Sequence, residues 1–95
     1  MVKIVWTDAA ITDLKSIHSY IARDSKTHAD RFINKLISKV DQLEIHPNSG
    51  RVVPEFNKDA IRELIEGSYR IIYTLAPDHI SIIRIHHSSR LLRTI

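Results

Sequence analysis

Arginine and histidine side chains gather in the last third of this 95-residue chain, and they are the residues most able to do chemistry. Every Lys or Arg after Lys58 is an arginine. Arginine keeps its charge at any relevant pH and binds phosphate or carboxylate groups bidentately. From residue 61 onward, the arginines are Arg62, Arg70, Arg84, Arg90 and Arg93, and the adjacent histidines His86 and His87 lie among them.

The net charge of the chain comes from this part alone. Residues 67–95 hold four arginines and one acid, Asp78, whereas residues 1–66 hold ten basic and ten acidic side chains. The difference of +3 in the C-terminal part equals the formal net charge of the whole chain. The pattern predicts a local basic surface and a partner that is acidic or polyanionic.

The His86-His87 pair is not a convincing metal site. Neighbouring residues in a strand point to opposite faces of the sheet, so the two rings cannot easily bind one ion. Acidic side chains do not cluster near them, and the chain has no cysteine. We therefore expect no metal and no cofactor, and no disulfide framework.

Three short apolar runs must position these basic residues. They cover residues 61–65, 69–75 and 80–85, and they are separated by Glu-Gly-Ser and by Ala-Pro-Asp. Runs of this length, rich in isoleucine and bounded by glycine or proline, are typical of strands, and the short breaks favour hairpins. The sequence therefore predicts an antiparallel meander.

The first half of the chain predicts a strand and two helices. Residues 2–6 are β-branched and strand-like, and Thr7 or Asp8 can cap a helix whose apolar stripe ends at Ile21. Its polar side carries Asp13, Lys15 and Ser19. A second helix can start at Ser25 or Thr27 and end before the turn-forming residues 46–50. Residues 51–60 form a connector, and Pro54 keeps it from being a central strand.

These elements predict a single α+β domain over residues 1–95. An antiparallel helical hairpin should pack on one face of a small antiparallel sheet and leave the other face, or its rim, for function. Strand alternation places Tyr69, Ile71 and Tyr73 on the helix side and Arg70 on the other. In the last strand, it groups Ser81, Ile83, Ile85 and His87 on one face and Ile80, Ile82, Arg84 and His86 on the other. We expect Arg84 and His86 to lie on the face of Arg70.

Targeting signals and membrane spans are not evident. No apolar run approaches the ~20 residues that a membrane-spanning helix needs. The N-terminal residues, MVKIVWTDAA, lack the pattern of a signal peptide. We expect a cytoplasmic protein without membrane contact.

Five segments of the chain together resemble the RelE/ParE superfamily, the toxins of bacterial type II toxin–antitoxin systems. They are IVWTDAAITDLKSIHSYIA, RFINKL, GRVVPEF, IRELIEGSYRIIYTL and IRIHHSSRLL, so the resemblance runs nearly from end to end. It implies the same helical hairpin on a small sheet. It also implies a cognate antitoxin that binds the toxin in a hetero-oligomer.

The resemblance implies two alternative activities. RelE-like toxins are endoribonucleases that cut messenger RNA, commonly on the ribosome, whereas ParE-like toxins inhibit DNA gyrase and are known from plasmid stabilisation. In the ribonuclease alternative, Glu55 would be the base, Arg70 the phosphate clamp and His87 the acid, with Arg90 matching a C-terminal arginine. In the ParE-like alternative, the target-binding residues would be Arg62, Arg70, Arg84, His86, Arg90 and Arg93.

Departures from the nuclease pattern favour the ParE-like alternative. The lysine pair of RelE-like nucleases is absent, and Glu63 and Glu66 in the same region would repel RNA. The C-terminal aromatic residue is also missing, since the chain ends Arg93-Thr94-Ile95. A third alternative is an inactive homologue that only binds its antitoxin as a co-repressor.

Structural roles remain open for the same residues. Arg70 could simply pair with Glu63 or Glu66, and Glu55 could be a solvated loop acid. The basic row Arg31, Lys35 and Lys39 is more typical of a solvated helix face than of a nucleic-acid site.

Overall fold

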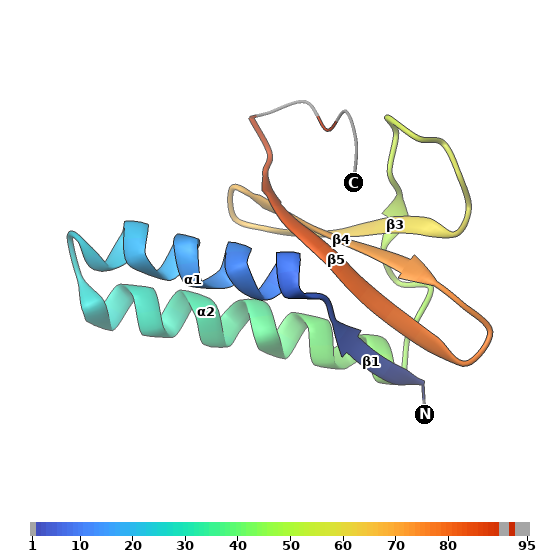
Figure 1. The fold of residues 1–95 in the computed structure, drawn as a ribbon, viewed down its shortest axis with the longest axis horizontal. Coiled ribbons are helices and arrows are strands. Elements are labelled where there is room, and N and C mark those ends of the chain that lie inside the picture. Colours follow the sequence, from blue (N-terminus) through green and yellow to red (C-terminus); the bar gives the residue numbers. More distant parts are fainter. Residues whose placement is uncertain (1, 90–91, 93–95) are drawn as a thin grey trace.

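Two helices lie on one face of a five-stranded sheet (Figure 1). The computed structural model describes residues 2–89 and residue 92. The elements, in chain order, are β1 (Lys3–Trp6), α1 (Asp8–Ala22), α2 (Lys26–Asp41), the 3-10 turn η1 (Gln42–Glu44), β2 (Arg51–Val52), β3 (Ile61–Glu66), β4 (Tyr69–Leu75) and β5 (His79–His87). The predicted order of strand, two helices and meander is confirmed, and residues 51–60 contain only the two-residue strand β2.

Side-chain caps fix where both helices begin. Thr7 Oγ1 accepts a hydrogen bond from the Ala10 amide (3.2 Å) and so caps α1. Ser25 Oγ accepts one from the His28 amide (3.2 Å) and caps α2. Each oxygen satisfies an amide that has no partner within the first turn of its helix.

The sheet has the order β1-β5-β4-β3-β2 and is mixed. Strands β2 to β5 are antiparallel as predicted, but β1 pairs in parallel with β5, from Lys3 opposite His79 to Trp6 opposite Ile82. The expectation of a purely antiparallel sheet is therefore wrong at this edge. The helical hairpin between β1 and the meander provides the long connection that parallel pairing requires.

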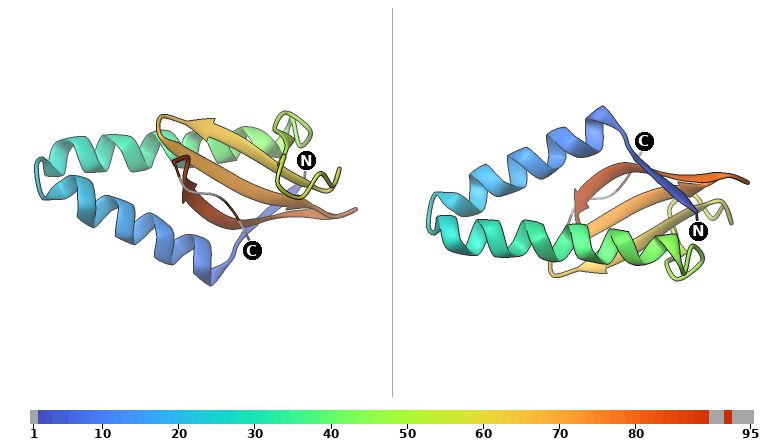
Figure 2. Two further views of the ribbon diagram at one scale, coloured as in Figure 1. Left: turned by 90° about the horizontal axis from the view of Figure 1, so that it is seen from above. Right: turned by 90° about the horizontal axis from the view of Figure 1, so that it is seen from below.

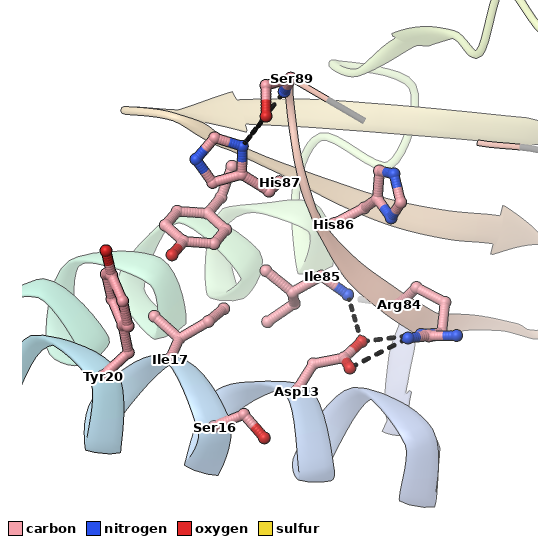
Figure 3. A pocket seen from close by; sticks show the side chains of 10 residues that line it. Asp13, Ser16, Ile17, Tyr20, Arg84, Ile85, His86, His87 and Ser89 are labelled. Atoms are coloured by element: carbon pink, nitrogen blue, oxygen red, sulfur yellow. Dashed lines mark hydrogen bonds and ion pairs between the residues drawn. The ribbon is translucent and has the colours of Figure 1, made fainter. Parts of the chain in front are cut away.

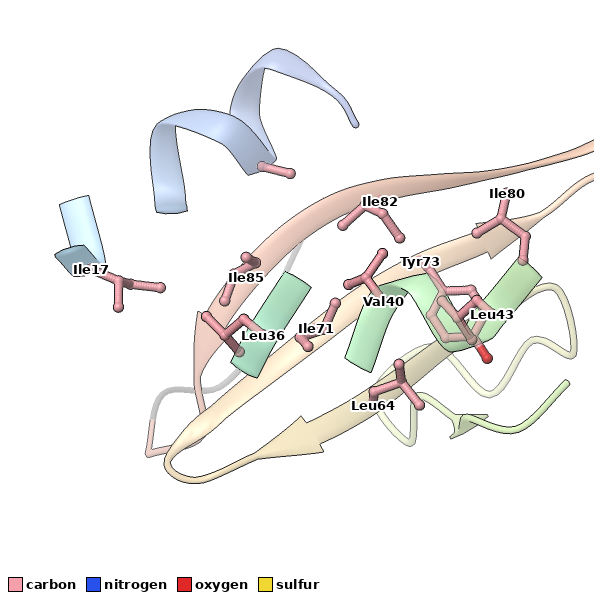
Figure 4. Close-up of a cluster of buried hydrophobic side chains, with 11 residues drawn as sticks. Ile17, Leu36, Val40, Leu43, Leu64, Ile71, Tyr73, Ile80, Ile82 and Ile85 are labelled. Carbon is pink, nitrogen blue, oxygen red and sulfur yellow. The ribbon is translucent and has the colours of Figure 1, made fainter. Parts of the chain in front are cut away.

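The main core lies between the helices and the sheet (Figure 4). Leu36 and Val40 of α2 pack there with Ile71 and Tyr73 of β4, and all four are fully buried. The predicted helix side of β4 is thus confirmed. The helices extend past the sheet, so that the turn between α1 and α2 projects away from it (Figure 2).

A β-bulge corrects the predicted faces of β5. Ile72 lies opposite Arg84, but the next residue, Tyr73, lies opposite Ile82, so the ladder skips Ile83. The extra residue reverses the alternation. Ile80 and Ile82 therefore join Ile85 in the main core, whereas Ile83 packs on the other side of the sheet. The predicted grouping of Ile83 with Ile85 is wrong for this reason.

The face of the sheet opposite the helices is partly filled. Val53, Ile72 and Leu92 are buried there in a second apolar cluster, and it is completed by the half-buried side chains of Phe56, Ile61 and Ile83. We call this group the outer cluster. The sequence predicted that this face, or its rim, would be left for function, and the connector and Leu92 cover part of the face.

Side chains also occupy both edges of the sheet. Beyond the end of β2, Lys39 Nζ donates to the Ile65 carbonyl of β3 (2.7 Å). Beyond the end of β1, Thr7 Oγ1 donates to the Ile82 and Ile83 carbonyls of β5 (2.8 and 3.2 Å). A carboxylate oxygen of Asp13 accepts from the Ile85 amide (2.9 Å).

Among the described residues, no helix combines the length and apolar character that a membrane span requires.

Candidate functional site

Arg70 lies at the centre of a chain of ion pairs on the outer face. Its Nη1 and Nη2 donate to the two carboxylate oxygens of Glu55 (2.6 and 2.7 Å), and its Nε donates to Glu63 (2.6 Å). The other oxygen of Glu63 accepts from Nε of Arg51 (2.6 Å). The side chain of Glu63 is fully buried and that of Arg70 is 8% exposed. Two positive and two negative charges therefore neutralise one another.

The guanidinium of Arg70 controls the protonation of Glu55. Its hydrogen bonds lower the pKa of Glu55 from 4.5 to about 2, and the backbone amides of Glu55 and Leu92 add to this effect against the opposing effect of burial. In turn, Glu55 first and then Glu63 raise the pKa of Arg70. Each charged form stabilises the other, so Glu55 is a weak base in this state.

Two structural interpretations from the sequence are thereby decided. The pairing of Arg70 with Glu63 is confirmed, while Glu66 instead pairs with Lys35 and Lys39 of α2 (both 3.4 Å). The interpretation of Glu55 as a solvated loop acid is wrong, because both of its oxygens are bound by Arg70. The Leu92 amide also donates to Glu55 (3.2 Å), which ties the end of the chain to the same network.

The structure does not bring the three residues of the ribonuclease alternative together. Glu55 and Arg70 are in contact, but His87 lies opposite Tyr69 in the β4–β5 ladder, and its ring packs edge-on against that phenol (5.2 Å between centroids). Tyr69 also contacts Phe32 of α2, so this pair faces the helices. The residue opposite Arg70 is His86. His87 is therefore on the other side of the sheet from Arg70 and Glu55.

The predicted target-binding arginines are mostly used within the fold. Arg62 binds Asp59 (2.8 Å) and the Gly50 carbonyl (3.0 Å), which holds two loops in place. Arg84 lies opposite Ile72, but its Nε and Nη2 reach the two oxygens of Asp13 in α1 (2.8 and 3.1 Å). The ladder confirms the expectation that Arg84 and His86 lie on the face of Arg70, but the guanidinium of Arg84 binds Asp13 and takes no part in the Arg70 network. Arg90 and Arg93 lie outside the described residues.

A groove runs between α1 and the free edge of β5 (Figure 3). It has a volume of about 410 Å³, within the range of ligand-binding pockets. Arg84, His86 and His87 line it from β5, while Asp13, Ser16 and Tyr20 line it from α1. Nδ1 of His87 accepts a hydrogen bond from the Ser89 amide (3.1 Å), so the neutral ring carries its proton on Nε2.

Sequence reasoning missed Arg51 and Asp13 as members of these networks. Arg51 lies directly opposite Glu63 in the β2–β3 ladder, but a two-residue strand leaves almost no periodic signal. Helical spacing placed Asp13 on the polar side of α1. Its partners, Arg84 and the Ile85 amide, come from β5, and their position beside α1 has no signal in the sequence. Within the described part of the chain, no group of three or more His, Asp or Glu residues could hold a metal ion.

Comparisons with known proteins agree with this fold. A family model described as the ParE toxin of the type II toxin–antitoxin system parDE matches residues 4–92. Toxin RelE2 of Caulobacter vibrioides is 35% identical over 92 residues, which cover 96% of this chain and 100% of that protein.

Solved structures share the fold at lower identity. The chromosomal ParDE system from P. aeruginosa superimposes with a TM-score of 0.75 at 22% identity, covering 92% of this chain and 96% of the other. The E. coli DinJ–YafQ complex gives a TM-score of 0.65 at 14% identity and covers 94% and 96%. The YoeB dimer from Staphylococcus aureus gives 0.61 at 16% identity and covers 90% and 95%.

The fold and these matches define the class of protein as type II toxins of the RelE/ParE superfamily. Within that superfamily, the chain belongs to the ParE toxin family, because the family model spans all but the two ends of the chain.

Proposed function

We propose that this chain is a toxin that inhibits DNA gyrase by binding to it in the cytoplasm, and that a cognate antitoxin neutralises it in a hetero-oligomer. Membership of the ParE family supports the general role. The chromosomal ParDE toxin–antitoxin system and the DinJ–YafQ complex, which share this fold, support an antitoxin partner.

The ion pairs of Arg70 are the observation that favours a mechanism of binding over one of RNA cleavage. Cleavage of RNA without a metal needs a base, an acid and a cation that is available to the scissile phosphate. All three nitrogens of the Arg70 guanidinium are bound to Glu55 or Glu63, and the pKa of Glu55 is about 2. Neither residue is therefore poised for catalysis in this structure.

The outer cluster supports the same choice. Ile72 is fully buried and Leu92 is 5% exposed on the sheet face that carries Arg70. An apolar, covered surface offers RNA neither hydrogen bonds nor a stacking platform. A phosphate that approached Arg70 would also meet two carboxylates.

Ribonuclease activity is the second candidate, and the name of the relative Toxin RelE2, 35% identical, favours it. It would require Glu55 to leave Arg70 when substrate binds. It would also require His86 to act in place of His87, since His86 is the residue opposite Arg70.

Pulse-labelling of DNA and protein synthesis after induced expression, without antitoxin, tests the proposal. We expect DNA synthesis to fall first while translation continues. A Glu55→Gln variant should keep its toxicity, as should the control Glu44→Gln, because neither carboxylate has a catalytic role. The folded fraction of each variant is checked by thermal melting.

Other outcomes point to the alternatives. An early fall in protein synthesis that Glu55→Gln abolishes and Glu44→Gln does not would establish the ribonuclease. If neither synthesis falls, the chain is an antitoxin-binding partner without toxic activity.

A further inference from the structure

Two grooves meet on the exposed side of α1, at Tyr20 and Ser16. The first is the groove between α1 and β5 (Figure 3), and the second, of about 440 Å³, lies along α1 between Lys15 and Arg23. Tyr20 and Ser16 line both, so the two form one continuous surface. We call it the Tyr20 groove, and its principal residues are Lys15, Ser16, Tyr20, Arg23, Arg84 and His87.

Tyr20 has the properties of a binding anchor. It is 67% exposed, although it belongs to a helix whose other large apolar side chains mostly face the core. Ile17, one turn earlier, is buried and lines the same groove. Tyrosine combines a large apolar surface with a polar tip, and it is enriched among the residues that dominate the energy of protein interfaces.

The charge of the Tyr20 groove is positive and largely uncompensated. Lys15 and Arg23 are exposed and have no ion-pair partner among the described residues. Asp13 is the one acid among the described residues of the lining, and Arg84 and the Ile85 amide bind both of its oxygens. Among the described residues, Nη1 of Arg84 and Nε2 of His87 have no hydrogen-bond acceptor. A ligand that complements this set carries carboxylates.

We propose that the Tyr20 groove is the surface with which this chain binds its target protein, and that the target presents an acidic segment around the Tyr20 ring. This inference rests on the proposed function and names the surface that performs it. It replaces Arg62 and Arg70 of the predicted target-binding set, because both side chains are used within the fold. Two members of the predicted set, Arg84 and His86, line the new surface.

A protein segment fits the groove better than a nucleic acid does. Proteins that bind single-stranded nucleic acid stack successive bases on several aromatic rings along a basic path. Here Tyr20 is the exposed ring, while Tyr69 packs between Phe32 and His87.

Inhibition of supercoiling by purified gyrase tests the inference with matched variants. Tyr20→Ala is compared with Ile45→Ala, which removes a similarly exposed apolar side chain elsewhere (70% exposed). The double variant Lys15→Glu/Arg23→Glu is compared with Arg31→Glu/Lys58→Glu, since these four residues are all exposed.

We expect both groove variants to raise the inhibitory concentration about tenfold or more, as removal of an interface anchor does. The two controls should stay within about twofold. Charge reversal should also weaken the salt dependence of inhibition, because it removes electrostatic steering. Co-purification with the protein encoded beside the toxin gene should be unchanged in every variant.

Equal inhibition by groove variants and controls would overturn the inference. So would a groove variant that still inhibits but no longer binds the neighbouring protein, which would make the groove an antitoxin site. Binding of a fluorescent single-stranded RNA that depends on Tyr20 would also overturn it in favour of a nucleic acid.

Growth arrest separates the inference from the proposed function. If the unaltered chain leaves supercoiling unaffected, the gyrase proposal fails, and the same four variants are then compared in growing cells. If only the two groove variants lose growth arrest, the result would support the groove as the target-binding surface. Arrest by all four, or by none including the unaltered chain, would reject it.

Discussion

The Glu63 carboxylate has no contact with solvent, and two guanidinium groups replace the water that it would otherwise bind. Breaking a buried ion pair by removing one partner costs about 3–5 kcal/mol. Arg70→Ala would leave Glu63 with Arg51 alone and Glu55 without its guanidinium partner. Arg70→Ala would therefore reduce toxicity through instability alone. This is why the Glu55→Gln comparison, at a partly exposed residue, is the better probe of catalysis.

Glu55 makes the stability of the fold depend on pH. Its pKa falls from 4.5 to about 2 on folding, so its contribution is complete above pH 4.5 and is lost as the pH falls through this range. We expect Glu55→Gln to remove about 1–2 kcal/mol at neutral pH, after allowance for solvent screening, and to flatten the loss of stability between pH 5 and 2. Urea denaturation at several pH values measures this. A curve as steep as that of the control Glu44→Gln would contradict the assignment.

At the scale of elements, one buried hydroxyl fastens the loop that leads from η1 to β2. Tyr73 Oη accepts from the Gly50 amide (2.9 Å) and donates to the Pro47 carbonyl (3.0 Å). The backbone of this loop passes so close to the Tyr73 ring and to β3 that only glycine fits at position 50. An added Cβ would lie 2.5 Å from Tyr73 Oη and 2.6 Å from the Glu63 carbonyl. This loop conformation places Arg51 opposite Glu63, where the two side chains pair.

Gly50→Ala should therefore destabilise the protein by more than about 2 kcal/mol, since the Glu63 carbonyl belongs to β3 and cannot move aside. Gly67→Ala is the matched comparison. Gly67 has a φ of +57° in the β3–β4 turn, but a Cβ there would meet only the Phe32 ring at 3.4 Å. Its cost should be nearer 1 kcal/mol, from backbone strain. Thermal melting of both variants checks that Gly50→Ala loses more stability than Gly67→Ala. Equal losses of stability would disprove the steric argument.

Local signals in the sequence were sufficient for most elements. The caps at Thr7 and Ser25, the helical stripes and the breaks around Gly67 and Pro77 each act within a few residues, so they predict where helices and strands lie. The bulge at Ile83 could not be predicted, because it depends on how β4 and β5 align. The parallel pairing of β1 likewise depends on which edge is open after folding.

The candidate site was predictable only in part. Sequence reasoning found Arg70 and the possibility of its pairing with Glu63, because neighbouring strands bring such residues together. It could not show that Glu55 would fold back onto Arg70, since the loop conformation is set by contacts with Leu92 and Val53. The Tyr20 groove had no sequence signal beyond an aromatic residue in an amphipathic helix.

At the scale of the whole molecule, the sheet separates two apolar clusters of very different size. The main core joins both helices to β1, β3, β4 and β5, whereas the outer cluster joins the connector and Leu92 to β3, β4 and β5. The small cluster is held together by a few side chains and by the Glu55 network. We expect it to open more easily than the main core.

Leu92→Ala tests this division. The loss of a side chain that is 5% exposed should cost about 2 kcal/mol, at the low end for buried leucine, because the site lies near the surface. Hydrogen exchange should speed up at the amides of Val53 and Asn57, which are bonded to Ile61 and Val53, before it does so at Ile71. Uniform acceleration would show that the two clusters unfold as one unit. Ile45→Ala is the control.

The side chains at the two edges of the sheet affect whether the chain associates with copies of itself. A bare strand edge is a template on which further copies can add, strand by strand, into an open-ended polymer. Lys39 at Ile65, and Thr7 and Asp13 at Ile83 and Ile85, occupy the backbone groups with which such growth would begin. We therefore expect the chain on its own to remain a discrete, diffusing particle and not to grow into such a polymer.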